Sequence, residues 1–463
     1  MTKKRDLSAR ETALSILVKW EERQAYSNLL LNQVLKESSF DERDKRLITE
    51  LVYGTIQRKN TLDWILNQLV KKGVQSLELW VRQLLRIGVY QLLYLHRIPE
   101  RAAIYETVQI SKKRGHRGIS GLVNGVLRSF VRNKQKLTPK SDPQTLTEKA
   151  IYYSHPEWMI KRMEQAYGED ETKEALLSNQ QPPRVSVRVN PLKIERVAFI
   201  KEWNTTENGK AKVSEIATEG VTISGGGNPA FTKWFQEGYC TIQDESSMLV
   251  ASALSPEPGM KVLDVCAAPG GKTTHLAEMM KNQGEIVACD VHDHKLFLIQ
   301  SNASRLGVDM ISVRQIDGRM LPKHFQPGTF DAILLDAPCS GLGVIRRKPD
   351  LKWSKEAKNI DALVELQKEL LDAAAPLLKP GGVLVYSTCT WEPRENMEQM
   401  NSFLKRHPDF AGDNRLMDKM PDPVKSRAQS GEFWIQILPH HFMSDGFFIS
   451  RVIKKQQGQV PFL

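Results

Sequence analysis

The chain has 463 residues, of which 41% are hydrophobic and 7% aromatic, and its mean hydropathy is -0.39. This length suits roughly two to four domains with substantial cores. No apolar run approaches the roughly 18 residues of a membrane-spanning helix, so the composition favours a globular protein over an integral membrane protein.

The cysteine content excludes two further classes. The chain has five cysteines and no CxxC pair: Cys240, Cys266, Cys289, Cys339 and Cys389. This odd set fits neither a disulfide framework nor a zinc ribbon, so we expect no metal site and thiols that are available for catalysis. The amino terminus passes from basic residues directly into an amphipathic pattern without a cleavage site, and we expect a cytoplasmic protein.

Positive charge is concentrated in the amino-terminal segment. Residues 1–140 carry 27 Lys and Arg against 13 Asp and Glu, whereas the remainder carries 38 against 41. Residues 111–140 hold nine basic residues and no acidic one, including Lys112, Lys113, Arg114, Arg117, Arg128 and Arg132. A short basic run is usually a solvated helix face, but one this long favours contact with phosphates.

The first 140 residues predict an all-α bundle. Ser8 and Glu11 have the spacing of a capping box, and the apolar residues that follow recur on one face of a helix: Ala13, Leu14, Ile16, Leu17 and Trp20. Residues 47–52 and 84–93 continue the helical pattern. Residues 136–144 combine Pro, Ser and charge, which predicts a linker.

The rest of the chain predicts two further domains. Residues 145–250 mix a helical segment at 155–168 with an alternating strand at 184–190, which predicts a small α+β domain that links the others or binds RNA. Residues 251–463 alternate strands with helices, which predicts a doubly wound α/β domain of Rossmann-like type. Its strands are expected at 261–265, 285–290, 311–317, 331–337, 381–388 and 447–453.

A glycine-rich turn follows the first strand of this α/β domain. Ligands bind such sheets at the carboxyl ends of the strands, where glycine allows close approach of the backbone. The turn consists of Cys266, Ala267, Ala268, Pro269, Gly270, Gly271 and Lys272. A phosphate-binding P-loop would require glycine at position 266, and a dinucleotide site would require GxGxxG, so both nucleotide-phosphate readings weaken.

Acidic residues end the next three strands of the α/β domain. Asp290 ends the second strand and suits the two hydroxyls of a ribose. Asp317 ends the third and could meet the amino group of an adenine, whereas Asp336 ends the fourth beside the expected point of reaction. One strand-end aspartate is usually a turn former, but three in succession after the glycine-rich turn favour a binding site.

Two cysteine turns lie beyond strand ends, with Cys339 in DAPCSGLG and Cys389 in YSTCTWEP. In a strand-ordered sheet these turns can converge in one crevice, which favours thiol chemistry. Carbon 5 of cytosine becomes nucleophilic when a thiolate adds to carbon 6, and a base must then remove the carbon 5 proton. Asp336 could donate a hydrogen bond or proton at N3, but this chemistry does not decide which cysteine attacks. We expect Cys240, Cys266 and Cys289 to be structural.

These motifs resemble the bacterial ribosomal RNA cytosine-5 methyltransferases of the RsmB (Sun, Fmu) family. The resemblance extends over nearly the whole chain and rests on CAAPGGKT, DAPCSGLGVIRRKPDLKW, YSTCT and LPHHFMSDGFF. The helical segment at 1–140 also resembles the NusB-like RNA-binding domain of this family. Thr390 stands where relatives often have Ser, a difference that we expect to matter little.

The resemblance implies a class I methyltransferase domain that binds S-adenosylmethionine and methylates a cytosine of small-subunit ribosomal RNA, free or partly assembled. It implies that Cys389 is the nucleophile and that Cys339 assists product release. Donor contacts are implied for residues 266–272, largely through the backbone, and for Asp290, Asp317 and Asp336. Arg346, Arg347 and Lys348 are expected to hold RNA phosphates or to face solvent.

Three alternatives remain open at the level of sequence. A transfer-RNA methyltransferase of the same superfamily would share the catalytic half. A noncatalytic RNA-binding or antitermination factor is suggested by the helical segment alone, although both cysteines beside the strand-end acids argue against it. A protein or small-molecule methyltransferase would need neither the basic segment nor paired cysteines.

Overall fold

The computed structural model describes residues 7–23 and 26–456. Contacts among them divide the chain into two compact units. The first unit, called the helical unit below, contains the described residues up to Gln180 together with Arg347–Lys355. The second, called the sheet unit, contains Gln181–Arg346 and the described residues from Glu356 onward. The three-part division at residues 140–145 and 250–251 remains a prediction.

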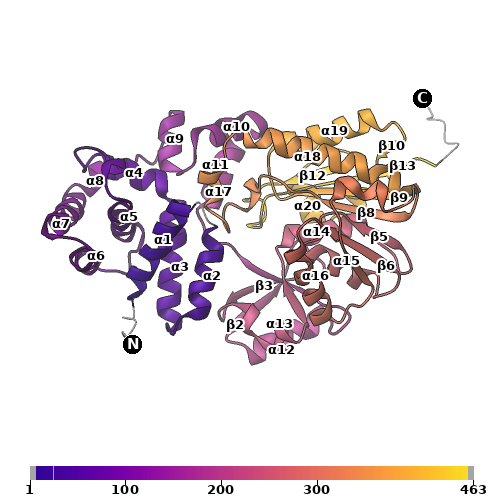
Figure 1. Cartoon of the computed structure of the whole chain (residues 1–463), viewed down its shortest axis with the longest axis horizontal. Helices are drawn as coiled ribbons and strands as arrows, with labels where there is room; N and C mark the ends of the chain where they lie inside the picture. Colours follow the sequence, from indigo (N-terminus) through magenta and orange to yellow (C-terminus); the bar gives the residue numbers. More distant parts are fainter. Residues whose placement is uncertain (1–6, 24–25, 457–463) are drawn as a thin grey trace. The chain divides into compact units, whose positions relative to one another are not determined.

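The described residues of the helical unit form a series of helices (Figure 1): α1 (Ala9–Arg23), α2 (Ser27–Glu37), α3 (Glu42–Gln57), α4 (Lys59–Asn67), η1 (Val74–Ser76), α5 (Leu79–Tyr94), α6 (Glu100–Arg114), α7 (Arg117–Arg132), α8 (Lys134–Leu137), α9 (Leu146–Tyr152), α10 (Glu157–Tyr167), α11 (Glu169–Asn179) and α17 (Leu351–Ser354). The capping box before α1 is confirmed, because Ser8 Oγ accepts from the Glu11 amide at 3.3 Å and Glu11 Oε2 accepts from the Ser8 amide at 3.1 Å. No helix in the described ranges is both long and apolar enough to cross a membrane.

The short segment Arg347–Lys355 lies in sequence between two stretches of the sheet unit but packs within the helical unit. Lys352 is fully buried there, and its ammonium donates to the carbonyl oxygens of Gln57 (2.7 Å) and Ser154 (2.8 Å). Trp353 Nε1 donates to the carbonyl of Ile56 at 2.7 Å. Burial, assisted by the charge of Arg58, lowers the pKa of Lys352 well below its ordinary value.

The sheet unit begins with a small antiparallel sheet in the order β2-β3-β1-β4. Its strands are β1 (Val185–Val189), β2 (Gly209–Val213), β3 (Gly220–Gly225) and β4 (Cys240–Ile242), accompanied by α12 (Arg196–Thr206), η2 (Pro229–Phe231) and α13 (Lys233–Gln236). The alternation predicted at 184–190 is confirmed as β1. Val187 and Val189 pack with Phe199 and Trp203 of α12 in a separate small core.

The large sheet of the same unit has the strand order β11-β12-β13-β9-β8-β5-β6-β7, and β10 also pairs with β13. Its strands are β5 (Lys261–Asp264), β6 (Glu285–Asp290), β7 (Ile311–Gln315), β8 (Phe330–Asp336), β9 (Leu378–Thr388), β10 (Phe410–Gly412), β11 (Gln429–Ser430), β12 (Trp434–Ile437) and β13 (Phe447–Lys454). Strands β5 to β9 run parallel, whereas β13 is antiparallel to β9. The order reverses at β5, which places a ligand-binding crevice at the carboxyl ends of β5 and β8.

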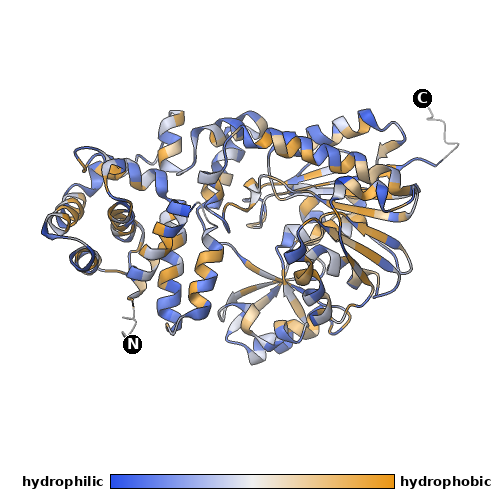
Figure 2. Ribbon diagram, in the orientation of Figure 1, coloured by the Kyte–Doolittle hydropathy of each residue, from blue (hydrophilic) through white to orange (hydrophobic). Residues whose placement is uncertain are grey.

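Helices and short helical turns surround the large sheet: α14 (Glu245–Leu254), α15 (Gly271–Met279), α16 (Asp293–Leu306), η3 (Gly318–Lys323), η4 (Leu342–Val344), α18 (Asn359–Ala374), η5 (Ala375–Leu377), η6 (Pro393–Glu395), α19 (Met397–Arg406), η7 (Asn414–Lys419) and α20 (Asp422–Arg427). Successive residues of β8 face opposite cores. Leu334 packs in the core of α14 and α15, and Leu335 packs in that of α18 and α19. The strands of this sheet are accordingly rich in hydrophobic residues (Figure 2), as expected when both faces are covered.

Candidate functional site

The turn after β5 is shaped by glycine and by one buried carboxyl group. Gly270 has a φ of 97°, and a Cβ there would lie 3.0 Å from the Cα of Ile299, so the turn requires glycine at this position. Thr273 Oγ1 donates to Asp264 Oδ2 at 2.7 Å, which ties the first turn of α15 to the end of β5. Burial raises the pKa of Asp264 to about 7, with the Thr273 hydrogen bond opposing the shift and the charge of Asp336 adding to it.

The three predicted strand-end acids have different surroundings. Asp290 is buried at the end of β6, and its Oδ1 accepts from the His292 amide at 2.9 Å. Asp290 and Asp336 both act electrostatically on Asp264, so these acids lie around one turn. The prediction that Asp317 ends the third strand is wrong, because β7 ends at Gln315 and Asp317 caps the start of η3. Asp317 pairs with Arg319 at 2.7 Å, which lowers the pKa of its carboxyl. The Asp317 carboxylate, which the sequence assigns to the methyl donor, is therefore already paired with Arg319.

Lys272 and Asp336 form an ion pair at the carboxyl end of β8. Lys272 Nζ lies 2.7 Å from Asp336 Oδ2, and Ser387 Oγ donates to Asp336 Oδ1 at 2.8 Å. Burial lowers the pKa of Lys272, but the charges of Asp336 and Cys389 outweigh it, and the pKa is raised overall. Both oxygens of Asp336 thus act as acceptors. The sequence analysis did not single out Ser387, although its position in the YSTCT motif at the end of β9 could have indicated it.

The structure brings Cys339 and Cys389 together, with the two Sγ atoms 3.4 Å apart. The hydrogen bond with Cys389 and burial raise the pKa of Cys339 well above its ordinary value. Burial also raises the pKa of the other thiols, to about 12 for Cys240 and Cys289 and well above the ordinary value for Cys266. Cys240 and Cys289 are buried, and Cys266 lies near the carboxyl groups of Asp264, Asp290 and Asp336, so the thiol pair at the sheet edge is distinct from all three.

A buried carboxylate connects the two cysteine turns. Glu395 is fully buried and accepts from the Ser340 amide (2.9 Å), the Ser340 hydroxyl (2.5 Å) and the Gln367 amide group (2.9 Å). Ser340 Oγ also lies 2.9 Å from Thr390 Oγ1, so the residues after Cys339 and Cys389 share one network. Sequence reasoning missed Glu395 because nothing in its spacing reveals a partner 55 positions away. A serine at position 390 would offer the same hydroxyl.

Close backbone contacts hold the same turns. The Gly343 amide donates to the Cys389 carbonyl at 3.0 Å, and the Gly446 amide donates to the Gly343 carbonyl at 2.9 Å. A Cβ on Gly343 would lie 2.0 Å from the oxygen of Gly446. Three of the four segments that carried the resemblance, those with Gly343, Cys389 and Gly446, therefore meet at one place, and this close approach requires glycine at position 343.

The expectation that Arg346 holds phosphate or faces solvent is wrong. Its side chain is buried, and its guanidinium donates to the carbonyls of Met443 (2.8 Å) and Pro439 (2.7 Å). A buried guanidinium that is engaged with backbone carbonyls is an anchor for the loop before β13. Arg347 is half-buried and Lys348 exposed, and both belong to the segment that packs within the helical unit.

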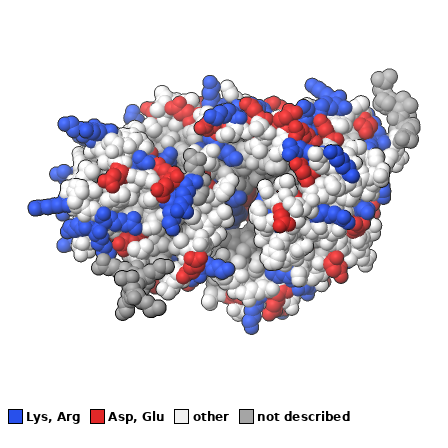
Figure 3. Space-filling model, in the orientation of Figure 1, with Lys and Arg blue, Asp and Glu red and all other residues white. Residues whose placement is uncertain are grey.

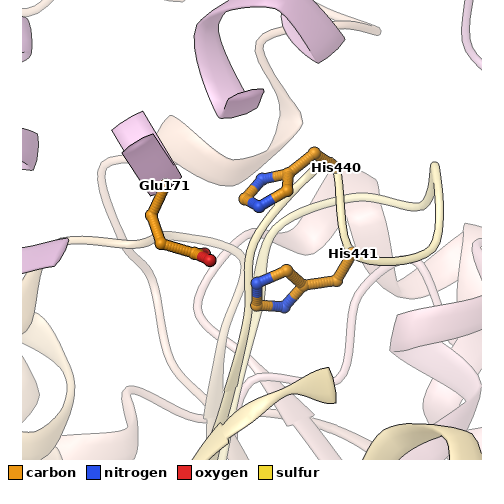
Figure 4. Close-up of side chains that lie close together, drawn as sticks. All are labelled: Glu171, His440 and His441. Carbon is orange, nitrogen blue, oxygen red and sulfur yellow. The ribbon is translucent and has the colours of Figure 1, made fainter. Parts of the chain in front are cut away.

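Two neighbouring histidines occupy the loop between β12 and β13 (Figure 4). The imidazole rings of His440 and His441 have centroids 4.5 Å apart and meet edge to face at 70°. His441 Nδ1 accepts from the Leu438 amide at 3.2 Å, so this ring nitrogen stabilises the turn. Glu171, also drawn in Figure 4, belongs to α11 of the helical unit.

The turn after β5 suits S-adenosylmethionine in two respects. A Cβ on Gly271 would meet no atom within 4 Å, so the backbone at the start of α15 is open. Asp264 Oδ1 is buried, and within the described ranges it has no hydrogen-bond partner. An open helix start beside carboxylates at β5, β6 and β8 offers acceptors for ribose hydroxyls and an amino group.

Three family models match successive parts of the chain. The NusB family matches residues 7–132, the ferredoxin-like domain of RsmF/B-like methyltransferases matches residues 155–228, and the 16S rRNA methyltransferase RsmB/F family matches residues 251–453. The matches follow the helices, the small sheet and the large sheet in order. The fold class predicted from the sequence is confirmed: a NusB-like helical region, a small sheet domain and a Rossmann-like methyltransferase domain.

Individual relatives match over nearly the whole length. "Probable ribosomal RNA small subunit methyltransferase B" of Bacillus subtilis is 44% identical over 97% of this chain and 99% of the relative. A protein of the same name from Synechocystis is 37% identical over 97% of this chain and 100% of the relative. A solved methyltransferase homolog from Pyrococcus horikoshii is 31% identical with a TM-score of 0.56, covering 67% of this chain and 98% of that chain.

Proposed function

This chain belongs to the RsmB/F family of 16S rRNA methyltransferases, and from that premise we propose that it methylates carbon 5 of a cytosine in small-subunit ribosomal RNA. S-adenosylmethionine is the methyl donor in this proposal, and Cys389 forms a covalent adduct with carbon 6. The observation that carries the proposal is the 3.4 Å separation of Cys339 and Cys389 at the sheet edge that also holds Asp336.

The donor would be held by the residues around β5, β6 and β8. Backbone groups of residues 266–272 would hold its amino-acid portion, and Asp290 would accept from its ribose hydroxyls. We also assign Asp317 to the adenine amino group, for which its carboxylate must accept a further hydrogen bond beside Arg319. When bound, S-adenosylmethionine supplies an electrophilic methyl group on a positively charged sulfur.

Cys389 acts first in the proposed mechanism. Its thiolate forms the S–C6 bond, and the electron pair of the C5–C6 double bond moves into the ring, which makes carbon 5 nucleophilic. Lys272 lies close enough to Cys389 for their charges to interact, and a neighbouring cation favours the thiolate. Asp336 acts on the N3 and amino side of the ring, where a hydrogen bond stabilises the charge that develops as sulfur adds.

Cys339 completes the reaction as the base. The Sγ atoms of Cys339 and Cys389 are in hydrogen-bond contact at 3.4 Å, and Cys339 loses this partner once the Cys389 sulfur is bonded to carbon 6. Once carbon 5 carries the methyl group, Cys339 takes the proton from carbon 5 and the C5–C6 double bond re-forms. The S–C6 bond breaks, and its electron pair returns to the Cys389 sulfur. The contact between the two sulfurs is symmetric, so the order of the two thiols in this proposal rests on the family resemblance.

The test compares wild type with Cys389→Ala and Cys339→Ala, using labelled donor and small-subunit ribosomal RNA. We expect Cys389→Ala to give neither 5-methylcytosine nor a denaturant-resistant adduct, and Cys339→Ala to accumulate the adduct. Cys289→Ala, which removes a buried thiol in β6, is the control and should turn over like wild type. The opposite pattern would exchange the roles of the cysteines, and methylation of transfer RNA alone would reassign the substrate.

A further inference from the structure

The helical unit has an open groove between α6 and α7, with a volume of about 1410 Å³. Five cationic side chains line it: Arg101, Lys112, Arg117, Arg128 and Arg132. All five are exposed, and Lys and Arg side chains gather over this region in Figure 3. Within the described ranges none of the five forms an ion pair, although paired lysines and arginines occur elsewhere in the same unit.

The acidic residues nearby do not neutralise this groove. Glu100 and Glu106 are its only acidic lining residues among those described, and Glu100 pairs with Lys134 at 3.3 Å. The sequence of α7, Arg117–Arg132, contains no acidic residue. A concave surface with excess positive charge focuses the field on an anion, and neutralisation of phosphates releases counterions.

Not all of the basic run found in the sequence contributes to the groove. Lys113 pairs with Glu11 of α1 at 3.4 Å, and Arg114 donates to Ser15 of α1 at 2.9 Å, so these two side chains are engaged on another surface. Lys112, Arg117, Arg128 and Arg132 line the groove instead. Arg101 of α6 joins them although it lies outside the run at 111–140. Tertiary packing therefore selects which cations face a common ligand.

An exposed aromatic ring lies in the same groove. Tyr105 of α6 is 59% exposed, which is unusual for a large aromatic side chain on a helix that also packs against neighbours. An accessible ring among cations is the combination with which proteins bind single-stranded nucleic acid, because bases stack on the ring while cations follow the backbone. A paired duplex would bury its bases and leave the ring without this role.

We propose that the groove between α6 and α7 binds a single-stranded segment of the RNA substrate, with phosphates on its five cations and an unpaired base on Tyr105. The proposal rests on the proposed function in taking RNA as the substrate. It adds a specific surface and a preference for unpaired RNA. The helical unit then contributes affinity through charge and stacking, without a hydrogen-bond readout of sequence.

The test measures binding of the full chain to a labelled single-stranded oligouridylate and to a perfectly paired RNA duplex of equal length. The double variant Arg117→Ala/Arg128→Ala should bind the single strand at least about tenfold more weakly, with a salt dependence reduced by about 0.7 in slope for each cation removed. Tyr105→Ala should weaken single-strand binding by about fivefold or more and leave the salt slope unchanged. Lys71→Ala/Lys72→Ala, which alters two exposed lysines outside the groove, should bind like wild type.

A steric variant separates the shape of the groove from its charge. Gly121 and Gly125 of α7 line the groove, and a Cβ on either would meet no atom within 4 Å. Gly121→Leu/Gly125→Leu should therefore fold, fill the groove and weaken binding of the single strand. Gly121→Ala/Gly125→Ala should also fold, and its affinity for the single strand should be closer to that of wild type than the affinity of the leucine variant. Thermal unfolding of each variant checks that loss of binding is not loss of folding.

Several results would overturn the proposal. The proposal fails if the groove variants bind the single strand like wild type. It also fails if the Lys71/Lys72 control loses as much affinity as they do, or if the groove variants lose affinity only for the duplex. Normal RNA binding combined with lost capture of a small-subunit ribosomal protein would assign the groove to a protein partner instead. Methyl transfer is scored separately: groove-dependent RNA binding by a wild type that methylates no RNA would leave the groove standing and refute the proposed function.

Discussion

Lys272 Nζ and Asp336 Oδ2 lie 2.7 Å apart, and this ion pair joins the first turn of α15 to the carboxyl end of β8. The lysine thereby links the glycine-rich turn to the strand end that precedes Cys339. Its ring contact with Phe447, at 5.1 Å from ammonium to centroid, extends the link to β13. One side chain thus connects the segments to which donor binding and methyl transfer are assigned.

Loss of the Asp336 charge should affect both activity and stability. Asp336→Asn leaves the largely buried ammonium of Lys272 without its partner, and we expect about 1 to 2 kcal/mol of destabilisation near neutral pH. Because the pKa of Lys272 is raised, the contribution of the pair is fully present below the ordinary lysine pKa and is lost as pH rises through the raised value. Methyl transfer should fall by about a hundredfold or more.

Urea unfolding and single-turnover methyl transfer measure these two effects. Asp361→Asn is a matched control, because Asp361 is an exposed acid of α18. Equal losses of activity in Asp336→Asn and Asp361→Asn would contradict the role assigned to the ion pair.

Asp264 should make the sheet unit less stable as pH rises. Its pKa is raised to about 7, so the folded protein holds the proton more tightly than the unfolded chain between about pH 4 and pH 7. The stability that protonated Asp264 contributes is therefore lost as pH rises from about 4 to about 7. Asp264→Asn mimics the protonated carboxyl and should gain stability relative to wild type by up to roughly 4 kcal/mol at the alkaline end. Urea unfolding at about pH 4 and about pH 8 measures the difference, and a pH-independent difference would refute the assignment.

Glu395 should determine the positions of the two cysteine turns. Glu395→Gln replaces an acceptor oxygen with a donor that faces the donors of Ser340 and Gln367, and we expect roughly 2 to 4 kcal/mol of destabilisation. Single-turnover methyl transfer should slow while affinity for S-adenosylmethionine is retained, because Glu395 accepts hydrogen bonds from Ser340, which follows Cys339, and from Gln367 of α18. Glu398→Gln removes the same charge from an exposed position of α19 and is the control. Wild-type turnover by Glu395→Gln would exclude a positioning role.

Lys352 should stabilise the helical unit although it follows the catalytic motif in sequence. Lys352→Met leaves the carbonyls of Gln57 and Ser154 without their donor, which should cost about 1 to 3 kcal/mol. Hydrogen exchange in α3 and α9 should accelerate, whereas Lys358→Met, at an exposed position outside that unit, should leave it unchanged. Because the pKa of Lys352 is lowered, wild-type stability from this group falls as pH drops from the ordinary lysine pKa toward the lowered value. Unchanged exchange in Lys352→Met would show that the segment is held by other contacts.

The sequence by itself determined the order and type of the main elements. Alternation and apolar runs report local burial, so the strands at β1, β5, β6, β8, β9 and β13 were predictable, as was the capping box before α1. The glycine-rich turn and the two cysteine turns were visible as motifs because each is continuous in the chain. The order of strands in a parallel sheet then implied that their carboxyl ends share one edge.

Only the tertiary structure decided which side chains meet across long sequence separations. Glu395 binds Ser340 from 55 positions away, and Arg346 reaches the carbonyl of Met443 from 97 positions away, so neither contact leaves a local pattern. Lys352 is buried, and its side-chain nitrogen donates to two carbonyls of the helical unit that are far away in sequence. The physical reason is that periodicity reports whether a position is buried, whereas the partner of a buried polar group is fixed by how distant elements pack.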